Sequence, residues 1–204
     1  MDFGLDKIKA LWLLAGIVDH DASVLIDGND HDIFTLWHAK VAREKILYPP
    51  LDDIETVKDT FFKATKKTPV SILLEFNSWP VARTDCYIVE PQGPLVMFSN
   101  LTEGEFDEFM IAPISQKYFA RMQHNLLVSE NTAGSFVGYN KTKNQINIIN
   151  VLADEIFIEK LLSLEIKFWR SVIKGRLDLG RGYNEKSIRG VYENFFEDFK
   201  ENSL

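Results

Sequence analysis

Apolar side chains recur every three or four residues along the first third of the chain, which is the period of an amphipathic α-helix. Prolines and Gly- or Asp-containing turns interrupt this pattern and separate four predicted helices. Their expected ranges are residues 2–14, 22–26, 32–46 and 52–67. Asp19 or Asp21 is expected to cap the second helix, because a carboxylate at a helix start accepts hydrogen bonds from unpaired backbone N–H groups.

The pattern changes after Pro69, where short β-branched and aromatic runs alternate with turn residues, as is typical of strands. Three strands are expected at residues 70–76, 85–89 and 94–98, and two more at 135–139 and 145–151. Between these groups, the acidic segment 103–108 is expected to be a loop and residues 115–128 a helix. A long helix is expected over residues 154–174. This order predicts an α/β or α+β fold, in which helices flank a mixed central sheet of about five strands.

The chain has 204 residues, which is enough for one domain with a sizeable core. We expect residues 1–175 to form that domain. Residues 176–204 have the composition of a Gly- and Arg-containing hinge followed by an amphipathic helix that carries Phe195, Phe196 and Phe199. These rings are too apolar to leave in water, so the helix is expected to pack on this domain or on another chain.

Composition narrows the class of protein. Hydrophobic residues make up 46 % of the chain and charged residues 26 %, which is typical of a globular protein and excludes a disordered or fibrous one. Cys86 is the single cysteine, which excludes a disulfide framework and a cysteine-based zinc site. No apolar run is long enough to span a membrane. We therefore expect a cytoplasmic protein with no membrane partner.

Net charge limits the ways in which the chain can bind a partner. Its 30 acidic and 23 basic side chains give a formal net charge of −7. A protein of this charge is not attracted as a whole to nucleic-acid phosphates. Binding to DNA would need a local basic patch, for which the candidates are Lys63, Lys66, Lys67 and Arg121.

Several short motifs follow one another through most of the chain. They are Gly16-Ile-Val-Asp-His-Asp-Ala, Leu36-Trp-His-Ala-Lys40, Ile54-Glu-Thr-Val, Ala82-Arg-Thr-Asp-Cys and Tyr118-Phe-Ala-Arg-Met-Gln. In this order they are similar to Gly-Ile-Gly-Ala-Ser-Asp-Ala, Leu-Trp-x-x-Lys, Leu-Glu-Pro-x-Ala, Ala-Thr-x-Asp-Gly and Tyr-x-x-Gln-x-Gln. The chain thus resembles the YqaJ and lambda-exonuclease branch of the PD-(D/E)XK nucleases.

This resemblance implies a nuclease fold with a metal-dependent active site. Such nucleases hold one or two Mg²⁺ or Mn²⁺ ions between a strand Asp and a Glu that lies two residues before a Lys. Asp85 matches the strand Asp, and Glu55 matches a helix carboxylate that some of these families also use. Met97 and Ser99 occupy the positions expected for the Glu and the Lys. Because a thioether and a hydroxyl cannot replace these groups, the site is expected to be vestigial and to hold no metal.

The resemblance also suggests residues that contact nucleic acid or a protein partner. Arg121 replaces the first Gln of the later helix, Gln123 matches the second, and His124 follows it. His20 stands where the resembled motif has a Ser that helps to grip a 5′ phosphate. These four residues and Arg83, which lies two positions before the strand Asp, are the candidate binding residues.

Asp85 has two further interpretations. In the first, Arg121 forms an ion pair with Asp85 across the former metal site, so that a salt bridge replaces the cation. In the second, Asp85 has no relation to a metal and pairs with Arg83 near the end of its strand.

The leading interpretation is a catalytically inactive relative of a phage-type exonuclease that acts by binding, without a cofactor. Its partner is expected to be a protein of DNA recombination or defence, or DNA itself, in a bacterial or phage-infected cell, and self-association stays open. The main alternative is an active exonuclease or endonuclease whose migrated site holds Mg²⁺ or Mn²⁺ through Asp85, Glu55, Glu75 and Glu90. An unrelated α/β binding module is the third interpretation.

Overall fold

The structure is a computed structural model that describes residues 16–42, 54–76, 82–89, 93–112 and 114–177. Its helices are α2 (Asp19–Asp27), α3 (Asp30–Ala42), α4 (Ile54–Thr65), α5 (Glu103–Ile111), α6 (Gln116–Ser129) and α7 (Glu155–Lys174). Its strands are β1 (Pro69–Phe76), β2 (Ala82–Val89), β3 (Leu95–Asn100), β4 (Ala133–Asn140) and β5 (Gln145–Leu152). The helices predicted over residues 2–14 and near the C-terminus lie outside the described residues.

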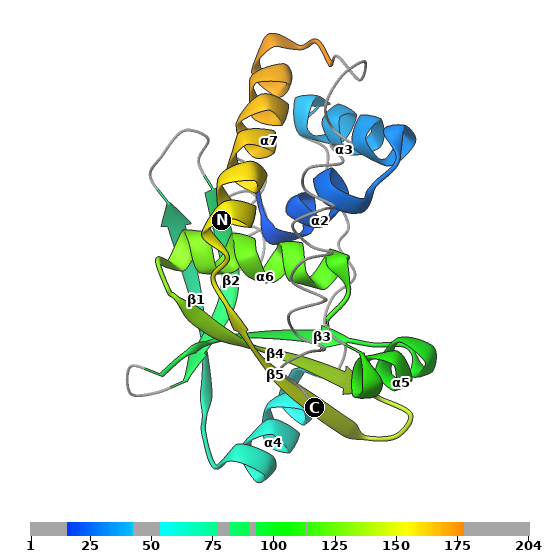
Figure 1. The fold of residues 1–204 in the computed structure, drawn as a ribbon, viewed down its shortest axis with the longest axis vertical. Helices are drawn as coiled ribbons and strands as arrows, with labels where there is room; N and C mark the ends of the chain where they lie inside the picture. The colour runs from blue at the N-terminus through cyan, green and yellow to red at the C-terminus, as the bar shows by residue number, and fades with distance from the viewer. Residues whose placement is uncertain (1–15, 43–53, 77–81, 90–92, 113, 178–204) are drawn as a thin grey trace, which may run out of the picture.

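All five strands form one sheet in the order β1–β2–β3–β4–β5 (Figure 1). Neighbouring strands are antiparallel except β3 and β4, which are parallel and are joined by a crossover through α5 and α6. Such a crossover is needed because the second strand of a parallel pair must begin at the same end of the sheet as the first. The predicted mixed sheet of five strands flanked by helices is confirmed.

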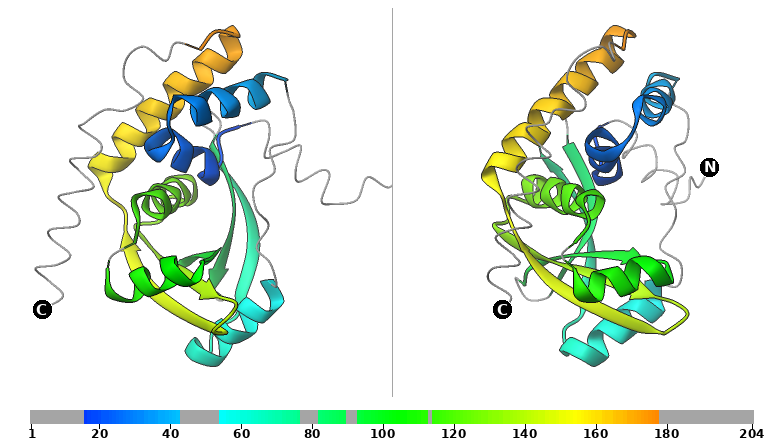
Figure 2. Two further views of the ribbon diagram at one scale, coloured as in Figure 1. Left: turned by 90° about the vertical axis from the view of Figure 1, so that its right-hand side faces the viewer. Right: turned by 45° about the vertical axis from the view of Figure 1, so that its right-hand side comes forward.

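Helices cover both faces of the sheet, and strand alternation sorts its side chains into two cores. The first core lies between the sheet and the helices α5 and α6, and it includes Phe119 and Phe136. The second lies between the sheet and α4, and it includes Phe61 and Phe98. Figure 2 shows the sheet curved around α6. β3 is in the middle of the sheet and is buried on both faces, because successive side chains of a strand point to opposite sides.

Helices α2, α3 and α7 form a further layer beyond α6 (Figure 1), with a small core of their own. Ile33, Leu36 and Phe168 are buried in this core. Trp37 and Trp169 are partly buried and pack against it. Among the helices that the structure describes, none is both long and apolar enough to cross a membrane.

Two predictions about the helices were wrong, one about the existence of a helix and one about a helix cap. The acidic segment 103–108 is not a loop but belongs to α5. Thr102 caps this helix, since its hydroxyl accepts a hydrogen bond from the Glu105 N–H and the Glu105 carboxylate accepts one from the Thr102 N–H. In α2 the N-cap residue is Val18, whose N–H donates to Asp21 Oδ2 at 3.0 Å, so neither aspartate is the cap itself.

Gly134 tests the packing of the parallel strand pair against α6. A Cβ atom at this position would clash with Met122 Cε and lie 3.0 Å from the Leu95 carbonyl oxygen. We expect Gly134→Val to lower the free energy of unfolding by about 2 kcal/mol, because an overpacked core must shift side chains and backbone. Gly104→Ala is the matched control, since nothing lies within 4 Å of its Cβ position. Urea denaturation should show this control to be neutral or stabilising, and equal losses in the two variants would contradict the packing argument.

Candidate functional site

Helix α6 is buried along most of its length, and four of its buried side chains are polar: Arg121, Gln123, His124 and Asn125. A buried polar group without a hydrogen bond costs about 1–3 kcal/mol, so each of these side chains needs a partner inside the protein. The partners come from α2, from α7, from β3 and from the connection between β5 and α7. These contacts fix the position of α6 relative to the rest of the structure.

Arg121 forms an ion pair with Asp19 of α2. Its Nε and Nη2 atoms both lie 2.8 Å from Asp19 Oδ2, and its guanidinium carbon lies 5.9 Å from the centre of the Tyr118 ring. Burial, the largest single effect, raises the pKa of Asp19, but the positive charge of Arg121, its hydrogen bond and the two nearby histidines together outweigh burial and lower this pKa to about 2. The carboxylate that pairs with Arg121 therefore comes from α2, and not from β2 as the hypothesis of an ion pair with Asp85 required.

Asp19 and Arg121 both depart from the resembled motifs, and the structure joins them. Asp19 stands where the motif has Ala, and Arg121 stands where the later motif has Gln. Either charge alone would be buried without a partner, so the two departures compensate each other. Because its guanidinium already binds a carboxylate, Arg121 does not belong to a basic surface patch.

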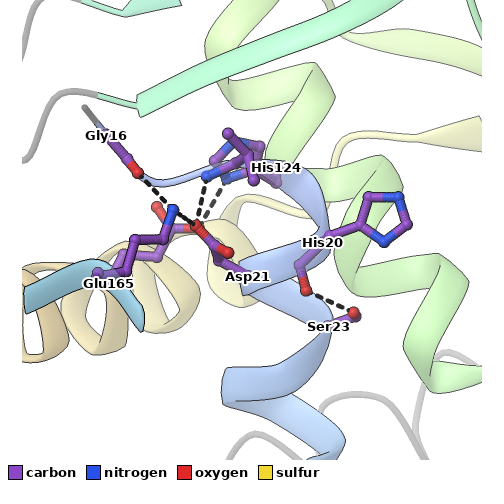
Figure 3. Close-up of polar contacts among 8 residues, drawn as sticks. Gly16, His20, Asp21, Ser23, His124 and Glu165 are labelled. Atoms are coloured by element: carbon purple, nitrogen blue, oxygen red, sulfur yellow. Dashed lines mark hydrogen bonds and ion pairs between the residues drawn. The ribbon is translucent and has the colours of Figure 1, made fainter. Parts of the chain in front are cut away.

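A second buried ion pair joins α2 to α3 (Figure 3). Lys40 Nζ lies 2.6 Å from Asp21 Oδ2 and donates to the Gly16 carbonyl oxygen at 2.9 Å. The side chains of Lys40 and Asp21 are 1 % and 0 % exposed. All three residues belong to the two N-terminal motifs, so those motifs meet in the structure. Removing one partner of such a pair typically costs about 3–5 kcal/mol, because it leaves a buried charge uncompensated.

His124 and Glu165 form the third buried pair, between α6 and α7. His124 Nδ1 and Glu165 Oε1 are hydrogen-bonded at 2.8 Å, and both side chains are fully buried. The other carboxylate oxygen, Glu165 Oε2, is buried and has no hydrogen-bond partner among the described residues. Figure 3 shows the imidazole of His20 turned away from Asp21, on the other side of α2. His20 is half-buried, and this burial lowers its pKa although the nearby Asp19 acts in the opposite direction.

Gln123 holds the start of α7 against α6. Its Nε2 atom donates to the Leu152 carbonyl at 2.8 Å, and its Oε1 atom accepts from the Asp154 N–H at 2.9 Å. Asn125 reaches the sheet, where its Nδ2 atom donates to Met97 Sδ at 3.2 Å. The amide side chains of Gln123 and Asn125 therefore both hold α6 in place.

The predicted binding residues are mostly internal. Arg121, Gln123 and His124 are at most 7 % exposed and bind other parts of the chain, so the expectation that they form a partner-binding surface was wrong. His20 is partly accessible. The side chain of Arg83 lies outside the described part of the protein.

The pairing of β2 with β3 decides which residues of β3 can lie beside position 85. Tyr87 pairs with Val96. Because side chains alternate between the faces of a sheet, position 85 shares the face of Tyr87 and Val96, and Phe98 lies on this face as well. The rings of Tyr87 and Phe98 are 5.1 Å apart, as expected for residues on one face.

Met97 and Ser99 lie on the opposite face. They are 4 % and 6 % exposed, and Met97 belongs to the core that packs on α6. This register places Met97 and Ser99 on the face of the sheet away from position 85, whereas the predicted Glu and Lys positions required them beside Asp85. A register that differs by one residue moves every side chain of a strand to the other face, and the sequence motif does not fix that register.

The face of position 85 carries apolar side chains where β3 crosses it. Val96 and Phe98 are 0 % and 5 % exposed and pack with Val57 and Phe61 of α4. The rings of Phe61 and Phe98 meet edge to face, with their centres 5.5 Å apart. Since Mg²⁺ requires oxygen ligands, these residues of β3 do not fit the metal that the resemblance implies.

Glu55, the predicted helix carboxylate, lies at the start of α4 with its side chain 81 % exposed, and it forms an ion pair with Lys58 at 2.9 Å. Across the described residues, no three acidic, histidine or cysteine side chains are close enough together to hold a metal ion. The side chains of Glu75 and Asp85, and all of Glu90, lie outside the described residues. The described side chains thus supply no metal centre.

Comparison with known proteins gives a structural match without a sequence match. No protein-family model matches the chain, and no curated protein is similar to it in sequence. Its structure is similar to the crystal structure of an alkaline exonuclease, LHK-Exo, from Laribacter hongkongensis, with a TM-score of 0.68. The chain shares the fold of LHK-Exo. The match covers 81 % of this chain and 92 % of LHK-Exo at 10 % sequence identity, and LHK-Exo in complex with dAMP matches with a TM-score of 0.67.

The ion pair of Asp19 with Arg121 predicts how stability depends on acid. Because folding lowers the pKa of Asp19 from 3.8 to about 2, the pair stabilises the folded state above pH 3.8 and loses this effect as the pH falls through 2. At neutral pH the shift corresponds to about 2 kcal/mol. Asp19→Asn should therefore be less stable than the parent chain at pH 7, and urea denaturation should show this difference shrinking below pH 3.8. A difference that stays constant down to pH about 2 would count against the ion pair.

The register of β3 predicts the outcome of rebuilding the motif. Met97→Glu combined with Ser99→Lys places two charges in the core under α6, so we expect a loss of several kcal/mol in the free energy of unfolding and no Mn²⁺-dependent cleavage. Ile111→Glu is the control for an added charge, because Ile111 is 89 % exposed, and it should leave stability unchanged. A folded double variant that cleaves DNA would show that the two positions do face Asp85.

Proposed function

We propose that this chain is a non-cleaving DNA-binding protein built on an exonuclease fold. The observation that carries this proposal is the face of the sheet around Val96 and Phe98, where β3 supplies packed apolar side chains and no metal ligand. The internal ion pair of Arg121 with Asp19 supports the non-cleaving part of this proposal, since this guanidinium is not free to stabilise charge on a scissile phosphate.

DNA is the partner that the structural similarity favours, because LHK-Exo has been crystallised in complex with dAMP. The net charge of −7 means that this chain would bind DNA through a local surface and not through its overall field. The same charge favours a protein of DNA recombination or defence as the other candidate partner. In both cases the protein acts by binding and needs no cofactor.

One observation favours an active enzyme as the second candidate function. In the pairing of β1 with β2, Leu73 lies opposite Asp85 and Glu75 lies opposite Arg83. Alternation along both strands therefore places positions 75 and 85 on the same face of the sheet. Two acidic positions so close together are the start of a Mg²⁺ or Mn²⁺ site that does not use β3.

A cleavage assay tests the proposal. End-labelled single-stranded and duplex DNA are incubated with stoichiometric protein and either Mg²⁺ or Mn²⁺, and the products are separated by size. We expect no metal-dependent products. We also expect about 10 mM Mg²⁺ to leave the thermal midpoint unchanged, because an ion held with a Kd near 1 mM would stabilise the fold by about 1.4 kcal/mol.

Asp85→Asn and Glu75→Gln are the informative variants for the second candidate. Metal-dependent cleavage that both variants abolish would replace the proposal by the active enzyme. Cleavage that both variants retain points to a contaminating nuclease, and a repeat after further purification then gives the result for this chain.

A further inference from the structure

The outer surface of α4 carries an aromatic side chain between two lysines. Lys58, Phe62 and Lys66 are spaced by four residues and therefore follow one another along one side of α4 and its C-terminal end. The side that packs on the sheet is a different one, through Val57 and Phe61. Phe62 is 46 % exposed, and Lys66 Nζ lies 6.0 Å from the centre of its ring. An exposed ring beside a cation is thus a surface feature of this helix.

The same surface continues onto the sheet. Lys58 Nζ lies 5.4 Å from the centre of the Tyr87 ring in β2. Tyr87 pairs with Ser71 of β1, so Leu73 is a diagonal neighbour of Tyr87 on the same face. Leu73 is 49 % exposed, which shows that no described helix covers the sheet at that point. The residues Lys58, Phe62, Lys66, Leu73 and Tyr87 together form what we call the α4 strip.

The α4 strip is locally basic in an acidic protein. Lys63 and Lys67 are exposed next to it. The acidic residues of this helix are Glu55, which pairs with Lys58, and Asp59. Residues 54–67 therefore carry four basic and two acidic side chains, against a net charge of −7 for the whole chain. An anionic partner is accordingly favoured here and disfavoured over most of the rest of the molecule.

We propose that the α4 strip binds single-stranded DNA. Unpaired bases stack on exposed aromatic rings, and lysines that flank those rings neutralise the phosphates between the bases. A duplex keeps its bases stacked on one another, so the exposed ring of Phe62 has no base to receive from it. The strip runs from the C-terminal end of α4 to Leu73, which lies opposite Asp85 in the pairing of β1 with β2. This inference rests on the part of the proposed function that names DNA as the partner, and it holds whether or not the chain cleaves DNA.

Fluorescence anisotropy with the full-length chain tests this inference. The probes are a labelled single strand of about 15 nucleotides and the duplex of the same sequence, both in EDTA at low salt. We expect tighter binding of the single strand. We also expect log Kd to change with log salt concentration with a slope of magnitude about 2–3, as three or four lysine–phosphate contacts to a single strand require.

The variants have closely matched controls. Phe62→Ala should weaken binding of the single strand about tenfold, whereas Phe34→Ala, which removes a ring that is 47 % exposed on α3, should leave it unchanged. Lys66→Glu should weaken binding about fivefold, and Lys174→Glu, which changes the net charge equally at the end of α7, should have no such effect. Thermal melting confirms that all four variants are folded.

Three results would overturn the inference: no binding of the single strand at low salt, equal binding of single strand and duplex, or equal losses in the strip variants and their controls. The first of these leaves a protein as the remaining partner. Because EDTA prevents metal-dependent cleavage, none of these results bears on whether the chain is an active nuclease. That question is answered separately by the cleavage assay, so the failure of one proposal is distinguishable from the failure of the other.

Discussion

The arrangement of the structure depends on α6, a helix that is buried between the sheet and a second layer of helices. Its buried polar side chains all require hydrogen-bond partners inside the protein. Arg121, His124 and Asn125 of α6 each have a partner on a different element: Asp19, Glu165 and Met97. Apolar packing specifies the position of a helix through shape, and several well-filled arrangements can have similar energies. Hydrogen bonds and ion pairs of buried groups specify it more sharply, since each displaced partner costs about 1–3 kcal/mol or more. The polar contacts of α6 therefore fix the positions of α2 and α7 over the sheet.

Strand alternation has an equally direct bearing on function. β3 contributes to two cores at once, so each of its residues is committed to one of them, and the side that carries Val96 and Phe98 is packed by α4. The similarity to LHK-Exo at 10 % identity concerns the arrangement of the backbone, and the same fold can carry different side chains at equivalent positions.

Local patterns in the sequence were enough to predict the fold. They were not enough to predict which residues far apart in the sequence contact each other. Each strand was predicted to within three residues of its observed ends, because alternation and turn residues are local signals. The α5 helix was missed although Thr102 and Glu105 form a capping box, which is itself a local signal. Which face of the sheet carries Met97 depends on the register of β2 and β3. The partner of Arg121 lies 102 residues away in the sequence. Neither of these contacts can be derived from the spacing of residues. The sequence did hold one signal of a buried polar contact, because Glu165 is a charged residue within the otherwise apolar side of α7.

The parallel pairing of β3 with β4 has a consequence for the order in which the chain folds. The strands β1 to β3 form a meander and β4 with β5 a hairpin, so both units can assemble from contacts between near neighbours. Only the β3–β4 seam joins them within the sheet, and it can close only after α5 and α6 have spanned the crossover. Loop-closure entropy opposes that step, which makes the seam a candidate for the late and slow event of folding. Until it closes, both units expose an unpaired strand edge, which is the interval in which such a chain is most prone to aggregate.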